Sequence, residues 1–176
     1  MSRCGGGARL ALITNPMEET TMSTGLDTFD KTVQESNLWL KDIMDRLNTE
    51  DRHHAYSTLR AVLHALRDRI GPESAAHLGA QLPMLLRGLY HEGWDPTGKP
   101  TKERHEEAFI AHIGRELPRS LPEEVHRGTF AVLDVLSKHV DRGEAVKIAN
   151  MFPAELRKFW PAFIQEAARG RQEGAA

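Results

Sequence analysis

The chain has 176 residues, with 23 Lys and Arg against 25 Asp and Glu, for a formal net charge of −2. This length fits one compact domain with its own core, and the balanced charge excludes the broad positive field of proteins that bind nucleic acid or anionic membranes. The single cysteine, Cys4, has no partner for an intrachain disulfide, and no apolar run approaches the roughly 18 residues of a membrane-spanning helix.

Residues 1–26 are predicted to be a disordered leader. They are rich in Gly, Ser, Thr and Met and show no helical or strand period. Their one apolar patch, Leu10 to Ile13, is too short for a signal peptide, so we expect a cytoplasmic protein. Met1, Met17 and Met22 all stay open as the true start.

Two helices are predicted in residues 27–70. The first begins at Asp27 or Thr28, and Asn48 or Thr49 is expected both to close it and to cap the second. Apolar residues recur every three or four positions in each helix. The expected buried faces are Phe29, Val33, Ser36, Trp39, Leu40, Ile43 and Leu47 in the first, and Tyr56, Leu59, Val62, Leu63, Leu66 and Ile70 in the second.

The second predicted helix also carries a charged face. Its residues Arg60, Arg67 and Arg69 are interleaved with Asp68. Mixed charge of this kind is typical of a face that water covers, rather than of a basic stripe that follows phosphates. We therefore expect these side chains to be solvated.

Pro83 divides the next apolar-periodic stretch. A proline inside a helix removes a hydrogen bond and clashes with the preceding turn, whereas it fits at the first helical position. We therefore predict a short helix at 73–80 and a fresh helix at 83–91, with one kinked helix as the alternative. The segment from Gly93 to Pro100 (GWDPTGKP) is rich in turn-forming residues and is predicted to be a connector.

Four further helices are predicted after the connector, at residues 102–117, 123–140, 144–150 and 153–168. A frayed tail is expected at 169–176. No segment shows the alternation of β-branched residues that a strand requires. The chain is therefore predicted to be all-α.

The chain repeats itself without gaps at an offset of seventy residues. Leu59 to Tyr90 aligns with Thr129 to Trp160, and within this alignment Pro83 falls on Pro153. A fixed period of this size indicates a duplicated supersecondary unit. We therefore predict two tandem repeats of three to four helices each, packed into one compact helical bundle. Its parts would be repeat one at 27–92, the connector at 93–100 and repeat two at 101–168.

The segments just described resemble the bacterial domain-of-unknown-function family numbered 2267. The resemblance runs from Phe29 to Trp160 and is most specific in Leu82 to Pro96 (LPMLLRGLYHEGWDP). It implies a small, soluble helical protein of bacteria or archaea without an established biochemical activity, and it supplies no catalytic residues. The second repeat departs from the first where RGLY (87–90) becomes RKFW (157–160), so a function of the GWDP segment would belong to the first repeat alone.

The connector matches the first seven positions of a phosphate-binding P-loop. That motif needs a Ser or Thr after its lysine and a loop that joins a strand to a helix. Here Pro100 follows Lys99, a helix precedes the loop, and Pro96 removes a backbone N–H donor. A plain turn is the favoured interpretation.

Three pairs of side chains have spacings that suit a metal or haem between helices: Glu50 with His53, Glu123 with His126, and His105 with His112. The two Glu-x-x-His pairs do not correspond under the seventy-residue offset. Both fall in first turns of helices, where the helix dipole alone favours acidic residues. A metal- or haem-binding bundle is therefore the rival hypothesis, and we expect no cofactor.

No catalytic constellation stands out in the sequence. There is no serine in a nucleophile-elbow setting such as G-x-S-x-G, and the only cysteine lies in the leader. An enzyme stays open, but the sequence favours a non-enzymatic protein.

The best candidate binding segment lies at the end of the first repeat, because aromatic residues beside an arginine are enriched at interaction hot spots. It comprises Arg87, Tyr90, His91, Trp94 and Asp95. The alternative is that Tyr90 and Trp94 simply fill the seam between the repeats. We hypothesise an interaction module that binds a protein or small-molecule partner at the inter-repeat groove, with no nucleic-acid or membrane partner and with homodimerisation left open.

Overall fold

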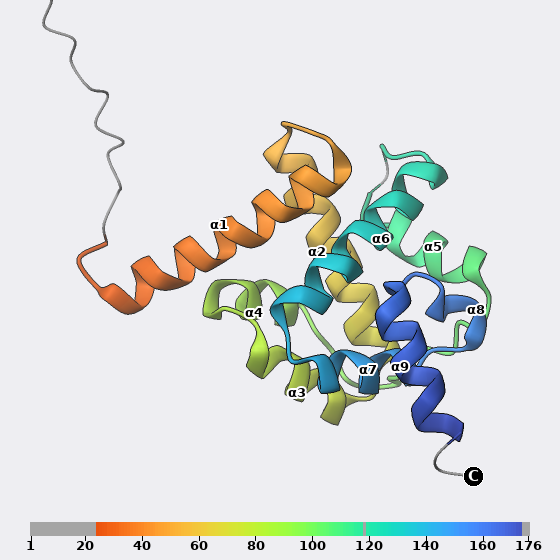
Figure 1. Ribbon diagram of the computed structural model, residues 1–176. Coiled ribbons are helices and arrows are strands. Elements are labelled where there is room, and N and C mark those ends of the chain that lie inside the picture. Colours follow the sequence, from red (N-terminus) through yellow and green to blue (C-terminus); the bar gives the residue numbers. More distant parts are fainter. Residues whose placement is uncertain (1–23, 118, 174–176) are drawn as a thin grey trace, which may run out of the picture.

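The computed structural model describes residues 24–117 and 119–173, and in this part of the chain all regular structure is helical (Figure 1). The helices are α1 (Asp27–Leu47), α2 (Arg52–Arg69), α3 (Pro72–Gln81), α4 (Met84–His91), α5 (Glu106–Gly114), α6 (Pro122–His139), α7 (Arg142–Asn150), α8 (Ala154–Arg157) and α9 (Ala162–Glu173). The all-α prediction is confirmed for the described residues. Residues 1–23 of the expected leader and residues 174–176 of the expected tail lie outside them.

α2 is the central helix of the molecule. It packs against α1, α4, α5 and α6, and α1 also packs on α4 and α6 (Figure 1). From Thr58 to Asp68 nearly every side chain of α2 is buried, because neighbouring helices cover it on several sides. The buried apolar side chains of both halves of the chain belong to one cluster that includes Ile43, Leu66, Leu136 and Trp160.

The junction between α1 and α2 differs from the prediction in its cap. Asn48 closes α1 in the left-handed conformation, with φ of 50°. The cap of α2 is not Asn48 or Thr49 but Asp51, whose carboxylate accepts from the His54 backbone N–H at 3.0 Å. A side-chain acceptor at the N-cap satisfies an N–H that the first turn leaves unpaired.

Parts of the predicted apolar faces are exposed rather than buried. Phe29 and Val33, near the start of α1, are 48% and 40% exposed, whereas Thr32 of the same helix is buried and its hydroxyl accepts from the Leu85 N–H of α4 at 2.9 Å. Tyr56 is 42% exposed near the start of α2. The periodicity of these residues is helical as expected, but the start of α1 contacts α4 through the face that carries Thr32.

Pro83 separates two helices, as predicted, and the kinked-helix alternative is wrong. Leu82 and Pro83 are extended, so α3 ends at Gln81 and α4 begins at Met84. Pro83 is therefore the N-cap of α4 and not its first helical residue. Pro153 holds the same place before α8.

The second half of the chain departs from the prediction at both ends. α5 covers only Glu106–Gly114, because the residues before it are tied to α2 by contacts described below. The single helix expected at 153–168 is two helices, α8 and α9, with Pro161 between them. A proline cannot donate the hydrogen bond that would continue α8. α9 then runs past Ala168 to Glu173 and packs against α7.

The helix boundaries follow the seventy-residue spacing in the middle of each half. α2 and α6 differ by seventy at both ends, and α3 and α7 begin at residues 72 and 142. The outer helices differ in length: α1 has 21 residues and α5 has 9. Among the described residues, no helix combines the length and the apolar character needed to cross a membrane.

Candidate functional site

Arg87, the first of the predicted binding residues, closes helix α3. Its guanidinium donates to the backbone carbonyls of Gly79 at 2.9 Å, Ala80 at 3.1 Å and Leu82 at 3.1 Å. The last carbonyls of a helix have no intrahelical partner, and a cation there is favoured by the helix dipole. The described contacts of Arg87 are therefore those of a capping residue.

Tyr90 lies in the core. Its side chain is 0% exposed, and burial raises the pKa of its phenol far above the usual value. Its hydroxyl has no hydrogen-bond partner in the structure. Tyr90 is thus placed as in the packing alternative, and Trp160, seventy residues later, is buried as well.

His91, Trp94 and Asp95 shape the turn after α4. The His91 ring lies between the rings of Tyr90 and Trp94, with centroid distances of 4.8 and 5.3 Å. Burial, reinforced by the charges of two arginines, lowers the pKa of His91. Asp95 is exposed and accepts from the Thr97 N–H at 2.8 Å, which lowers the pKa of its carboxyl. The five predicted residues therefore lie in one region. The described contacts of Arg87, Tyr90 and His91 are with other parts of the protein.

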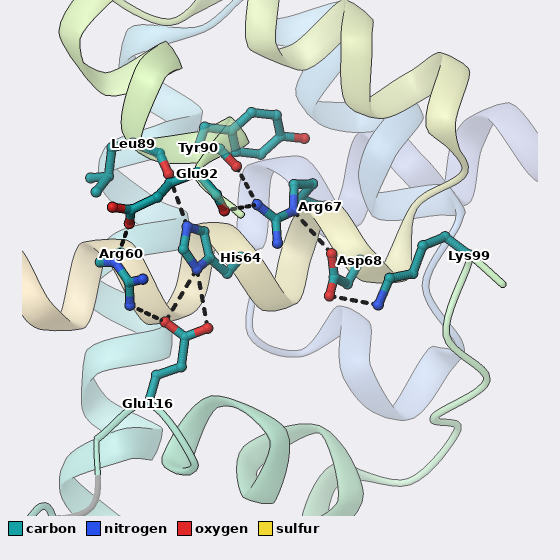
Figure 2. Close-up of polar contacts among 9 residues, drawn as sticks. All are labelled: Arg60, His64, Arg67, Asp68, Leu89, Tyr90, Glu92, Lys99 and Glu116. Atoms are coloured by element: carbon teal, nitrogen blue, oxygen red, sulfur yellow. Dashed lines mark hydrogen bonds and ion pairs between the residues drawn. The ribbon is translucent and has the colours of Figure 1, made fainter. Parts of the chain in front are cut away.

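A polar network on α2 holds this region in place (Figure 2). Arg60 donates to Glu92 at 2.8 Å and to Glu116 at 2.6 Å. His64, in the middle of α2, contacts Glu116 through Nδ1 at 3.1 Å and the Leu89 carbonyl through Nε2 at 2.9 Å. Buried His64 thus links the Glu116 carboxylate, which follows α5, to the Leu89 carbonyl of α4. Sequence reasoning missed His64, although it interrupts the apolar stripe between Leu63 and Leu66.

The expected solvated face of α2 is wrong. Arg67 and Asp68 are only 5% and 8% exposed. Arg67 donates to Asp68 at 2.9 Å and to the carbonyls of Tyr90 and Glu92 at 2.6 and 3.2 Å, while Lys99 donates to Asp68 at 2.7 Å (Figure 2). The last carbonyls of α4 lie over this face, and they need donors because they have no partner within their own helix.

The predicted metal ligands do not converge. His105 contacts Glu155 at 3.3 Å, and His112 contacts Glu103 at 3.0 Å. His126 contacts Glu106, which also binds Lys158. Glu50, His53 and Glu123 are exposed. In residues 24–117 and 119–173, no three His, Cys, Asp or Glu side chains are grouped so that they could hold a metal ion.

The hydrogen bond from Lys158, and a second one from His126, hold the pKa of Glu106 below its usual range against the opposing effect of burial. Glu106 and His126 line a hollow of about 510 Å³ between α5 and α6, whose apolar lining includes Ile110 and Val125. Sequence reasoning found His126 but not its partners, because they come from α5 and the residue after α8.

A groove that the sequence did not indicate lies where α1 meets α6. Its volume is about 470 Å³, and it is lined by Arg46, Leu47, Asn48, Arg127, Phe130, Ala131, Asp134, Phe159 and Pro161. Phe130 is 40% exposed and packs on buried Phe159, with ring centroids 5.0 Å apart and the ring planes tilted by 51°. Arg127 is exposed and has no hydrogen bond or ion pair within the described part of the chain. This groove contains side chains from both halves of the chain.

A family model matches most of the chain. The model of the family described as "Uncharacterized conserved protein (DUF2267)" matches residues 36–159, from the middle of α1 to Phe159, and so covers the α2 network, the connector and all the residues that line the α1–α6 groove except Pro161. Among curated proteins, none matches this chain. The matched segment is well over half of the sequence, and the chain therefore belongs to the DUF2267 family.

Proposed function

We propose that this protein is a non-enzymatic interaction module that binds a short acidic and apolar segment of a partner protein in the groove between α1 and α6. The observation that carries the proposal is the pair Arg127 and Phe130, an arginine without a described partner beside a half-exposed aromatic ring. Most polar side chains around the connector are occupied by contacts within the protein. Arg127, by contrast, makes no hydrogen bond or ion pair with a described residue, and Phe130 keeps 40% of its surface exposed.

The groove has the parts that a peptide site requires. Phe130 stands between the α1–α6 groove and a second hollow of about 390 Å³ that Pro122 and His126 also line. Arg127 and Phe130 are three positions apart on α6, so they project from the same face. An aromatic ring beside an arginine is the combination that most often dominates binding energy at protein interfaces.

The charges of the groove favour an acidic partner. Arg46 is bound to Asp134, so its charge is largely neutralised within the protein. Arg127 forms no ion pair with a described residue, although Glu123 lines the second hollow with it, and it can form a charge-assisted hydrogen bond with an incoming carboxylate. The apolar floor made by Ala131 and Phe159 suits an aliphatic or aromatic side chain next to that carboxylate.

We also infer that the groove lies between two halves of common origin. The support is the gapless seventy-residue spacing, which the boundaries of α2 and α6 follow. Under this spacing Phe130 corresponds to Arg60 and Arg127 to Ser57. Arg60 is occupied by Glu92 and Glu116, so the two halves use equivalent surfaces differently. The proposed binding site is therefore at Arg127 and Phe130 of α6, and not at Arg87 and Trp94.

Site-specific photo-crosslinking in the native host tests the proposal. A photoreactive phenylalanine replaces Phe130, and the adducts are identified by mass spectrometry. We expect a discrete adduct at an acidic, apolar segment of one protein. Arg127→Glu in the same chain should reduce its yield by about tenfold or more, because it replaces attraction by repulsion.

The matched control places the same photoreactive residue at Tyr56, an aromatic side chain that is exposed to a similar extent on α2. It should give no such adduct. The proposal fails if position 130 gives no discrete product, if position 56 gives the same one, or if the charge reversal leaves the yield unchanged. Circular dichroism of Arg127→Glu checks that the fold is intact.

A further inference from the structure

A pocket rich in positive charge lies where the connector passes the end of α2. Its volume is about 510 Å³, and four of its lining residues are the cations Arg69, Lys99, Lys102 and Arg104. No acidic residue lines it. The formal net charge of the protein is −2, so the gathering of four cations in one hollow is a local feature and not a consequence of the overall charge.

The fold holds the connector against α2 at this pocket. The Thr101 N–H donates to the Asp68 carbonyl at 2.8 Å, and Arg69 donates through Nε to the Glu103 carbonyl at 3.1 Å. The Arg69 guanidinium also lies over the Phe152 ring, 5.6 Å from its centroid. The backbone on both sides of Lys102 is thereby fixed, so its side chain and that of Arg104 start from defined positions.

The two neighbouring carboxylates, Asp68 and Glu103, already have partners and do not bind Lys102 or Arg104. Asp68 is shared between Arg67 and Lys99 (Figure 2). Glu103 contacts His112 at 3.0 Å. Lys102 and Arg104 are exposed and make no hydrogen bond or ion pair in the ranges that the structure describes. Two cations of the pocket therefore have no described counter-charge.

Burial is the main cause that lowers the pKa of the Arg69 guanidinium, and the attraction of Glu103 opposes it more than the charge of Arg104 adds to it. The uncompensated positive charge of the pocket therefore lies on Lys102 and Arg104. The pocket thus combines a volume of about 510 Å³, a fixed backbone and two cations without a described counter-charge.

We infer that this pocket binds a small phosphorylated molecule that carries a diphosphate group. Pockets of a few hundred Å³ accept small molecules, and a diphosphate can contact several cations at once. The inference is independent of the α1–α6 groove. It does not require a P-loop either. Asp68 already binds Lys99, the lysine of the P-loop-like string, and the free positive charge comes from the side chains of Lys102 and Arg104.

Isothermal titration calorimetry with pyrophosphate and with inorganic phosphate tests the inference on the full chain. We expect pyrophosphate to bind with a Kd below about 1 mM and inorganic phosphate to bind more weakly. The double variant Lys102→Ala/Arg104→Ala should lose at least about tenfold in affinity for pyrophosphate, because charge-assisted contacts are removed. Amide shifts on titration should concentrate at residues 98–104.

The matched control is Lys41→Ala/Arg115→Ala, which likewise removes one lysine and one arginine, but at exposed positions outside the pocket. It should bind pyrophosphate like the parent chain. The inference is overturned if pyrophosphate does not bind, if the control loses as much affinity, or if the shifts lie elsewhere. It is also overturned if a short DNA duplex binds more tightly than pyrophosphate and depends on the same residues, which would identify a nucleic-acid surface.

Discussion

At the scale of single residues, buried polar atoms without partners mark where packing prevailed over hydrogen bonding. The Tyr90 hydroxyl and the Trp160 indole N–H are both buried and have no hydrogen-bond partner among the described residues, at positions seventy residues apart. Each ring is among the largest fully buried side chains of the protein. Apolar area buried by the rings stabilises the fold, whereas an unpaired buried polar atom destabilises it.

Tyr90→Phe should therefore be neutral or stabilising, within about 1 kcal/mol in the free energy of unfolding, because it removes a hydroxyl that forms no hydrogen bond. Tyr90→Ala should cost about 3–5 kcal/mol through the cavity it leaves. Urea unfolding monitored by circular dichroism measures both, with Tyr56→Phe as the exposed control. A loss above about 2 kcal/mol in Tyr90→Phe would show that the hydroxyl has a partner, such as a buried water.

At the scale of elements, the crossing of α2 and α6 depends on one glycine. A Cβ at Gly128 would lie 2.5 Å from Cγ2 of Thr58, and both residues are buried. Thr58 is β-branched, so its methyl group cannot move far within the helix. Gly128 is thus required by the close approach of the two helices, in spite of the low helix propensity of glycine.

Gly128→Ala should destabilise the protein by about 1–3 kcal/mol, because the added methyl group overpacks the crossing. Adding Thr58→Ser removes Cγ2 and should restore part of the loss. Gly88→Ala is the matched control, at an exposed position of α4 with open space around it. It should raise the free energy of unfolding by about 0.5–1 kcal/mol. If Gly128→Ala stabilises the protein as Gly88→Ala does, the helices do not cross as closely as described.

At the scale of the whole molecule, carboxylates join segments that are distant in the sequence. Glu92 binds Arg60 of α2, Glu106 binds Lys158 and His126, and Glu155 accepts from the Glu106 N–H. The hydrogen bonds that these carboxylates accept are the leading cause that lowers each pKa below its usual value. Contacts between separate helices within each half of the chain therefore depend on ionised carboxylates.

Because these pKa values are lowered on folding, the stabilisation is present above about pH 4.5 and is lost as the pH falls through the folded values. The free energy of unfolding should fall steeply between about pH 5 and pH 3. Glu106→Gln should flatten this dependence, whereas Glu73→Gln at an exposed position should not. Urea titrations over this pH range measure the slopes. Equal slopes for the two variants and the parent chain would contradict the assignment.

How much the sequence predicted depended on how local the cause was. Periodicity, Pro83 and the left-handed Asn48 act within a few residues, and the helices they predicted are present with small shifts. The break at Pro161 has a local cause as well, but the apolar period across it predicted one helix at 153–168. Residues 101–105, which follow the connector, are not helical because Asp68 and Arg69 bind Thr101 and Glu103, and those partners lie on another helix.

The candidate sites were harder to predict for the same physical reason. Arg87 and Tyr90 have the composition of a hot spot, but a sequence does not show that one caps α3 and the other fills the core. His64 finds its partners 25 and 52 residues away. Arg127 and Phe130 were not distinguished from other surface residues, since the groove they line forms only when α1, α6 and Pro161 come together.

The sequence by itself determined the all-α class, most helix positions and the family, because these depend on short-range steric rules and on residue order. Only the tertiary structure decided which polar side chains are engaged within the fold and which have no described partner. The reason is that burial and charge pairing depend on neighbours brought together across the chain, so that Arg67 on α2 is a structural donor whereas Arg127 on α6 forms no ion pair with a described residue.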